Sequence, residues 1–200
     1  MNAFCAWLTA HGTSCLEFVA VLFGIAGVYL SILEKISNWP IGIVNVALYA
    51  LLFWQQRLYA NAGLQICYLG ISVYGWIRWV RGDPGGGALV VRTTSRPLAI
   101  RLVLATIMVW VALVALTRLF GGAMPVLDAG TTAVSLVAEW MLARKLMENW
   151  AVWIGVDAVY VAMLLSDRLF LTAINYAVYF VLAVMGYVAW KRLAAEPAPA

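Results

Sequence analysis

Charged residues are scarce in this sequence. Its 200 residues include 13 Lys or Arg and 9 Asp or Glu, which is 11% of the chain, whereas 65% of the residues are hydrophobic. Soluble domains carry roughly 25% charged residues, because their surface must be hydrated. A chain of this size cannot bury so many apolar side chains in one core. The composition excludes an ordinary soluble enzyme and a disordered chain, and it indicates an integral membrane protein that does not bind nucleic acid.

Residues that bind metals or perform nucleophilic catalysis are also few. The chain has one histidine, His11, and three cysteines, Cys5, Cys15 and Cys67, without metal-ligand spacing. No nucleophile–base pair is recognisable. We therefore expect no metal, no cofactor and no enzymatic activity. A disulfide between Cys5 and Cys15 is conceivable if the N-terminus lies outside the cell.

The apolar residues form continuous runs, which indicates membrane-spanning helices rather than the alternating strands of a barrel. A helix needs about 20 apolar residues to cross a bilayer. We predict seven spans, at 16–33, 40–55, 60–80, 98–118, 124–143, 150–166 and 170–190. Glycine, proline and charged residues between the third and fourth spans, at 81–97, predict a flexible loop.

The basic residues predict the orientation of these spans. Seven helices place ten basic residues on one side: Lys35, Arg78, Arg81, Arg92, Arg96, Arg101, Arg144, Lys145, Lys191 and Arg192. Three lie on the other side: Arg57, Arg118 and Arg168. Because the basic side of a membrane protein is cytoplasmic, we expect the N-terminus outside and the C-terminus inside.

The chain contains an internal repeat. An offset of 111 residues aligns 38–79 with 149–190 without a gap, and 12 of the 42 positions are identical. About three or four identities are expected by chance for this composition, so the repeat is real.

The repeat predicts an all-α, 3+1+3 architecture within one domain. A first three-helix repeat at 16–81 is followed by a linker helix at 98–118 and a second repeat at 124–192. The shift of four spans preserves orientation, so the repeats are parallel. Parallel repeats of this kind, including the SWEET plan, occur in transporters with a substrate site at mid-membrane.

Polar residues inside the spans outline a candidate site. Placing a carboxylate near the bilayer centre costs free energy, and buried amides need hydrogen-bond partners. Each such residue is therefore expected to have a structural or functional role. Aromatic faces with amides and one acid suit a flat, polar and possibly cationic ring compound. The candidates are Asn45, Gln65, Tyr68, Trp150, Trp153, Asp157, Asn175, Tyr176 and Tyr179.

Several of these residues have other interpretations. Tryptophans at span ends favour the membrane interface, and this is the preferred interpretation of Trp39, Trp79, Trp150 and Trp190. Asn45 and Asn175 could instead join helices. Asp157 could serve as a proton relay in a coupled transporter.

The sequence resembles the nicotinamide riboside transporter family (PnuC) over essentially its whole length. Matching residues include Asn45 and Gln65 as well as several longer motifs: Leu33-Glu34-Lys35-Ile36-Ser37-Asn38, Leu58-Tyr59-Ala60, Tyr74-Gly75-Trp76, Arg144-Lys145, Glu148-Asn149-Trp150 and Trp153.

The resemblance implies a bacterial inner-membrane vitamin transporter that forms a homotrimer. It also implies facilitated diffusion, which becomes effectively one-way when a cytosolic kinase phosphorylates the imported nucleoside. The kinase does not need to contact the transporter directly. Nicotinamide riboside is the expected substrate, with thiamine as the first alternative and riboflavin as the second. Some relatives have asparagine in place of Asp157, which leaves the role of this charge open.

Overall fold

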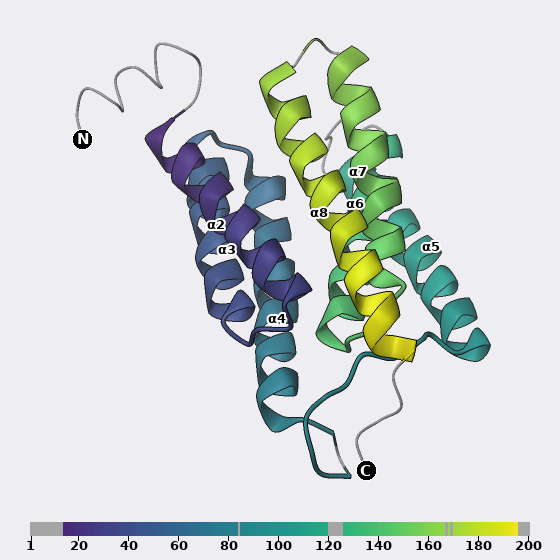
Figure 1. The fold of residues 1–200 in the computed structure, drawn as a ribbon. Helices are drawn as coiled ribbons and strands as arrows, with labels where there is room; N and C mark the ends of the chain where they lie inside the picture. The colour runs from purple at the N-terminus through teal and green to yellow at the C-terminus, as the bar shows by residue number, and fades with distance from the viewer. Residues whose placement is uncertain (1–13, 84, 120–125, 167, 169, 196–200) are drawn as a thin grey trace. The chain divides into compact units, whose positions relative to one another are not determined.

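The computed structural model describes residues 14–83, 85–119, 126–166, 168 and 170–195. The chain divides into two compact units, Met1–Val80 and Arg81–Ala200. The described residues form seven helices (Figure 1): α2 (Cys15–Ile32), α3 (Asn38–Gln55), α4 (Tyr59–Arg81), α5 (Arg96–Leu119), α6 (Val126–Ala143), α7 (Asn149–Ser166) and α8 (Phe170–Ala195).

These helices confirm the predicted all-α architecture. Each begins and ends within a few residues of a predicted span, although α8 continues to Ala195 and residues 124–125 lie outside the described part of the chain. Four helical segments are long and apolar enough to cross a membrane: Cys15–Ile32, Arg96–Leu116, Asn149–Ser166 and Thr172–Ala195. The apolar part of α6, Ala129–Ala143, is shorter.

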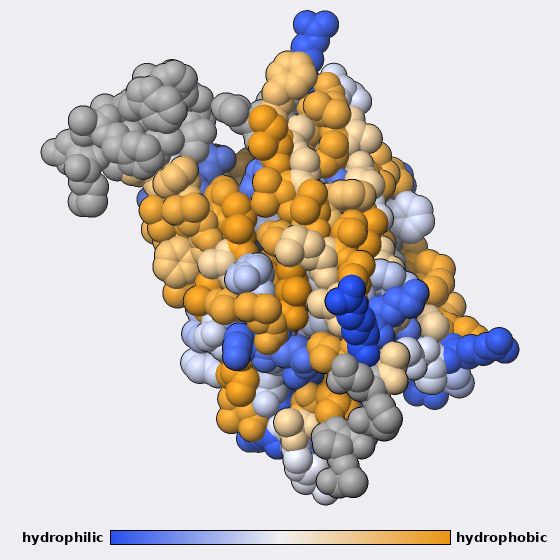
Figure 2. Space-filling view, viewed as in Figure 1, coloured by the Kyte–Doolittle hydropathy of each residue, from blue (hydrophilic) through white to orange (hydrophobic). Residues whose placement is uncertain are grey.

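Many apolar side chains are exposed, as a lipid-facing surface requires. On α5 the exposed fractions of Ile100, Val103 and Met108 are 62%, 59% and 68%. Figure 2 shows hydrophobic residues over most of the visible surface, with hydrophilic side chains gathered near helix ends. Exposed apolar area of this extent marks contact with lipid or with another protein.

The turns between helices repeat at the offset of 111 residues. Glu34 and Lys145 follow α2 and α6 with φ angles of 53° and 52°, and Arg57 and Arg168 follow α3 and α7 with φ angles of 61° and 59°. Left-handed backbone is uncommon for residues other than glycine and costs about 1–3 kcal/mol. The two units therefore reverse the chain in the same way at equivalent positions.

The four tryptophans at span ends are buried, which corrects the preferred expectation that they are interfacial anchors. Trp39 and Trp79 meet edge to face with ring centroids 5.5 Å apart, and Trp150 and Trp190 do so at 5.4 Å. None of the four is more than 5% exposed. Their rings pack between helices of the same unit, where an edge-to-face pair adds about 0.5–1.5 kcal/mol beyond area burial.

A glycine lies opposite Trp39 and another lies opposite Trp150, and these glycines make the packing possible. A Cβ atom at Gly186 would lie 2.5 Å from Cδ2 of Trp150, and a Cβ at Gly75 would overlap the Trp39 ring in the same way. Glycine is thus required at both positions because the indole ring lies directly on the backbone of the next helix.

The stretch at 81–97, expected from its composition to be a flexible loop, is bonded to the turn between α6 and α7 at Arg92 and Thr94. Arg92 pairs with Leu146 in an isolated parallel bridge, and the Arg92 side chain forms an ion pair with Asp83. Gly82 has a φ of +72°, and a Cβ there would collide with the carbonyl oxygen of Gly87. Tertiary hydrogen bonds have overridden the local preference for flexibility.

We predict that Gly186→Ala lowers the stability of the purified protein by about 1–3 kcal/mol, because an added methyl group overpacks the Trp150 ring. Thermal unfolding in detergent measures the change. The control is Gly155→Ala in α7, where an added Cβ meets nothing within 4 Å. Alanine there is expected to be neutral or stabilising by up to about 1 kcal/mol. Equal melting temperatures for the two variants would contradict the packing argument.

Candidate functional site

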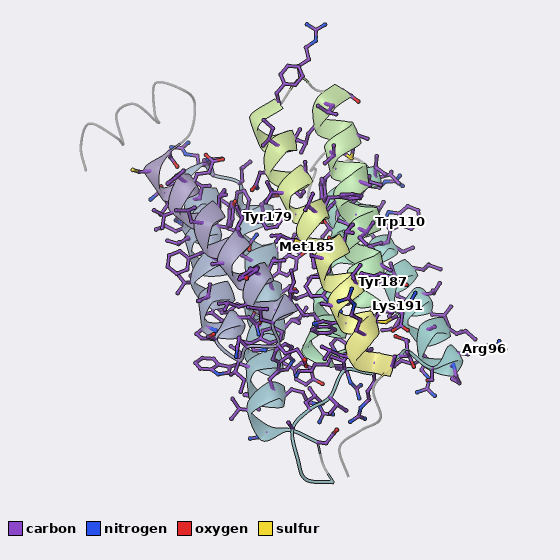
Figure 3. All side chains as sticks on the ribbon, in the orientation of Figure 1. Arg96, Trp110, Tyr179, Met185, Tyr187 and Lys191 are labelled. Carbon is purple, nitrogen blue, oxygen red and sulfur yellow. The ribbon has the colours of Figure 1, made fainter. Side chains whose placement is uncertain are left out.

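A series of contacts between one threonine and three tyrosines connects helices α6, α7 and α8 of the second unit. The hydroxyl of Thr131 in α6 is hydrogen-bonded to the hydroxyl of Tyr160 in α7, at 3.1 Å. The Tyr160 ring stacks on Tyr176 of α8 with centroids 4.6 Å apart. Tyr176 in turn contacts Tyr179 edge to face at 6.3 Å. We call these four residues the tyrosine cluster; Figure 3 labels Tyr179 on α8.

Asp157 lies at the level of this cluster. Trp150 packs on Gly186 and Tyr160 stacks on Tyr176, which fixes the register between α7 and α8. Asp157 lies three residues before Tyr160 in α7, and Tyr179 lies three residues after Tyr176 in α8. Because the two helices are antiparallel, Asp157 and Tyr179 lie at the same depth. Asp157 is 4% exposed. A carboxylate is therefore held beside tyrosine rings inside a membrane-spanning segment.

Two further predicted residues lie near Asp157. Trp153 is one turn away on the same face of α7, because a spacing of four residues returns to one side of a helix. Asn175 precedes Tyr176, and within the described part of the chain its buried Oδ1 has no hydrogen-bond partner. A buried acceptor without a partner costs free energy, which a ligand donor could recover.

Trp150 is placed differently from the other candidates of the second unit. It is 2% exposed and packs on Gly186 and Trp190. Its indole Nε1 is buried and has no partner among the described residues. The structure thus gives Trp150 a packing contact, and its part in a binding site stays a prediction.

The three remaining candidates belong to the first unit. Asn45 of α3 donates from Nδ2 to the carbonyl oxygen of Ala20 in α2, at 2.7 Å. This bond supports the alternative interpretation of Asn45 as a link between helices. Gln65 and Tyr68 of α4 are half-buried. Trp39 on Gly75 sets the α3–α4 register, which places Gln65 at the level of Tyr49 and Tyr68 at the level of Val46.

Equivalent positions of the two units therefore carry different polar groups. Tyr49 and Gln65 of the first unit correspond to the stacked pair Tyr160 and Tyr176 of the second. Val46 corresponds to Asp157. The backbone scaffold is therefore repeated, whereas the polar side chains at equivalent positions are not.

Sequence reasoning missed Thr131, Tyr160 and Glu139 as candidates. Tyr160 lies on the same helical face as Trp153 and Asp157, three residues beyond the latter, so its spacing could have found it. Glu139 is a half-buried acid in α6, within a predicted span, and its charge alone was a signal. Thr131 gave no signal in the sequence, because only its hydrogen bond with Tyr160 in the structure distinguishes it.

The arrangement in the second unit is suited to binding a cation. Tyrosine faces attract cations, more strongly when water is excluded. A buried carboxylate adds charge attraction, and the Asn175 acceptor adds a directional contact. Within the described residues there is no group of three or more His, Cys, Asp or Glu side chains that could hold a metal ion.

Comparisons with known proteins give one consistent result. The sequence model of a family described as nicotinamide mononucleotide transporter matches residues 14–192. The chain is 27% identical over 212 residues to the nicotinamide riboside transporter PnuC of Escherichia coli strain K12, covering 93% of this chain and 89% of that protein. It is 25% identical over 198 residues to the protein of the same name from Neisseria mucosa, covering 90% and 73%.

Two other relatives bear on the fold and the ligand. The riboflavin/roseoflavin transporter RibM of Streptomyces davaonensis is 24% identical over 178 residues, covering 87% of this chain and 83% of that one. The crystal structure of the vitamin B3 transporter PnuC superposes with a TM-score of 0.77 at 24% identity, covering 94% of this chain and 86% of the other. The last comparison shows that the two chains share a fold.

The hydrogen bond between Thr131 and Tyr160 is expected to contribute about 0.6 kcal/mol, the average for side-chain bonds between membrane helices. A double-mutant cycle with Thr131→Val and Tyr160→Phe, followed by unfolding in detergent, measures it. The control cycle combines Tyr160→Phe with Thr132→Val, because Thr132 is a buried neighbour of Thr131 on α6. Coupling in the control as large as in the test pair would argue against the bond.

Proposed function

The chain belongs to the nicotinamide mononucleotide transporter family, and on that premise we propose that it carries nicotinamide riboside into the cell. It is a multi-pass protein of the bacterial inner membrane. Relatives named as nicotinamide riboside transporters match about nine-tenths of its length. The nicotinamide ring of the riboside is a pyridinium cation, which is the kind of group that aromatic and acidic side chains bind.

One observation carries the choice of substrate. Asp157 is buried, at the level of Tyr179 in the α7–α8 pair and one turn before Tyr160, which stacks on Tyr176. Cation–π attraction and the carboxylate both favour a flat ring that carries positive charge. We propose that the tyrosine cluster, Trp153, Asp157 and Asn175, all of the second unit, hold the pyridinium ring. Gln65 and Tyr68 of the first unit stay candidates from the sequence.

The proposed topology is the 3+1+3 arrangement, with α5 as the linker and the N-terminus outside. The matched turns and tryptophan pairs of the two units support the parallel repeat. Cys15, the first residue of α2, is disulfide-bonded, as expected on an oxidising, extracytoplasmic side. Its proposed partner Cys5 lies outside the described residues.

The C-terminal ends of α6 and α8 have features of a membrane interface. The Arg144 guanidinium lies 4.9 Å from the centre of the Trp140 ring, and Lys191 Nζ lies 6.0 Å from that of Tyr187, on α8 in Figure 3. Basic and aromatic side chains mark the cytoplasmic membrane interface. These pairs support a cytoplasmic C-terminus.

The proposed transport is facilitated diffusion, and a cytosolic kinase traps the riboside by phosphorylation. The functional unit is proposed to be a homotrimer. These parts of the proposal rest on the family resemblance. A second candidate is a different vitamin: the likeness to a riboflavin/roseoflavin transporter favours riboflavin, and thiamine is cationic like the riboside.

Isothermal titration of the purified protein with nicotinamide riboside, thiamine and riboflavin tests the substrate. We expect binding of the riboside to be the tightest of the three. Tight binding of thiamine or riboflavin without binding of the riboside would overturn the first choice and favour the corresponding alternative.

Asp157→Asn is expected to weaken binding of the oxidised, cationic riboside about tenfold, which corresponds to about 1.4 kcal/mol. Binding of reduced nicotinamide riboside, whose ring is uncharged, should change less than twofold. Glu34→Gln, which removes an acid at the turn after α2, serves as the control. An equal loss for both forms of the riboside would mean that the Asp157 charge does not recognise the cation.

Proteoliposomes without an ion gradient test the mechanism. Facilitated diffusion predicts that riboside enters until the inner and outer concentrations are equal, and that an enclosed riboside kinase with ATP drives further uptake. Uptake that requires a proton gradient would instead support a coupled transporter with Asp157 as the relay.

A further inference from the structure

Residues 92–94, in the segment between α4 and α5, lie along the turn between α6 and α7, and we call them the strap. The Arg92 N–H donates to the Lys145 carbonyl oxygen at 3.0 Å, and the Met147 N–H donates to the Arg92 carbonyl oxygen at 2.8 Å. These two bonds form a parallel bridge between Arg92 and Leu146. The strap therefore adds one strand-like residue to a turn that connects two membrane helices.

A side chain fastens the strap to the beginning of α7. The Glu148 carboxylate accepts from the Thr94 N–H at 2.9 Å and from Thr94 Oγ1 at 2.5 Å. Hydrogen bonds to a charged acceptor are roughly twice as strong as neutral ones. Glu148 immediately precedes Asn149, the first residue of α7, so the bonds act where the helix begins.

The equivalent turn in the first unit differs in sequence and in exposure. Ser37 occupies the position of Glu148, and its side chain makes no capping hydrogen bond. Lys35 and Ile36 are exposed there, whereas the equivalent Leu146 is 6% exposed and Met147 is half-buried. The two turns share their backbone conformation, so the strap is an asymmetric addition to a symmetric scaffold.

We propose that the strap keeps α6, α7 and the start of α5 together as one rigid body through the whole transport cycle, and that Glu148 is a positioning residue for the substrate. The inference rests on the proposed function. Helix α7 carries Trp153, Asp157 and Tyr160, and the strap sets the depth of this helix from its first turn. Trp110 of α5 donates from Nε1 to the Val126 carbonyl oxygen at the start of α6, which joins α5 and α6 at a second point.

Hydrogen exchange of the wild-type protein tests the strap without reference to transport. Amides of 144–149 are expected to exchange at least tenfold more slowly than those of 33–38, because the strap is hydrogen-bonded to the former turn and this turn is more buried. Glu148→Ala should remove most of this difference, and Ser37→Ala should leave it unchanged. Equal exchange of the two turns in the wild type would overturn the proposal.

A reversible cross-link tests whether the strap stays attached during transport. Neighbouring strands lie about 4.8 Å apart, within the range that a disulfide spans. Arg92→Cys with Leu146→Cys, in a background where the exposed Cys67 is replaced by serine, should form this bond on oxidation. Riboside uptake by proteoliposomes should differ less than twofold between oxidised and reduced protein. Loss of uptake on oxidation that a reductant restores would show that the strap must open, and would overturn the proposal.

The role of Glu148 is tested by titration and uptake together. Glu148→Ala is expected to raise the Kd for the riboside and to lower the initial uptake rate at least fivefold, while Glu148→Gln, which keeps an acceptor oxygen, recovers to within twofold of the wild type. Ser37→Ala is the matched control and should behave as the wild type. Wild-type activity of Glu148→Ala would contradict the positioning role. Failure of the wild type to bind riboside would refute the proposed function instead, and hydrogen exchange would still decide the strap.

Discussion

The contact of the Trp150 ring with the backbone at Gly186 fixes how α7 and α8 lie against each other. An indole ring is large and rigid, and it can rest on a helix backbone only where no Cβ intervenes. Once this contact is made, the register of the two helices is determined along their length. Tyr160 then meets Tyr176, and Asp157 lies level with Tyr179. The candidate site thus depends on a packing contact two turns away from it.

The first unit contains the same contact between Trp39 and Gly75, and the two units also share their turn geometry. What differs is the chemistry that the shared scaffold presents. The second unit has an acid and stacked tyrosines where the first has Val46, Tyr49 and Gln65. The strap adds a further difference, because it fastens only the turn that leads into α7. The two units therefore share a frame but differ in the polar groups at equivalent positions and in the segment that is bonded to one of their turns.

Polar groups in the bilayer link these observations. Water is absent there, so each buried donor or acceptor is expected either to form a hydrogen bond within the protein or to serve a ligand. Asn45 finds Ala20 in a neighbouring helix, and Thr131 finds Tyr160. Asn175 retains a buried acceptor without a partner among the described residues. This contrast separates groups that join helices from groups available to a ligand.

The sequence by itself determined the membrane class, the positions of the helices and the 111-residue repeat, because apolar runs and matched residues are local or linear signals. It also predicted Asp157, Tyr176 and Tyr179 as candidates, since polar residues in apolar spans stand out. It could not determine that Trp39 and Trp150 are buried, because an indole at a span end suits a membrane interface equally well. Only the tertiary structure decided this, by placing a glycine opposite each ring. Likewise, the glycine-rich composition of residues 82–95 predicts mobility, and only the bonds to Lys145, Met147 and Glu148, more than fifty residues away, hold this segment in place.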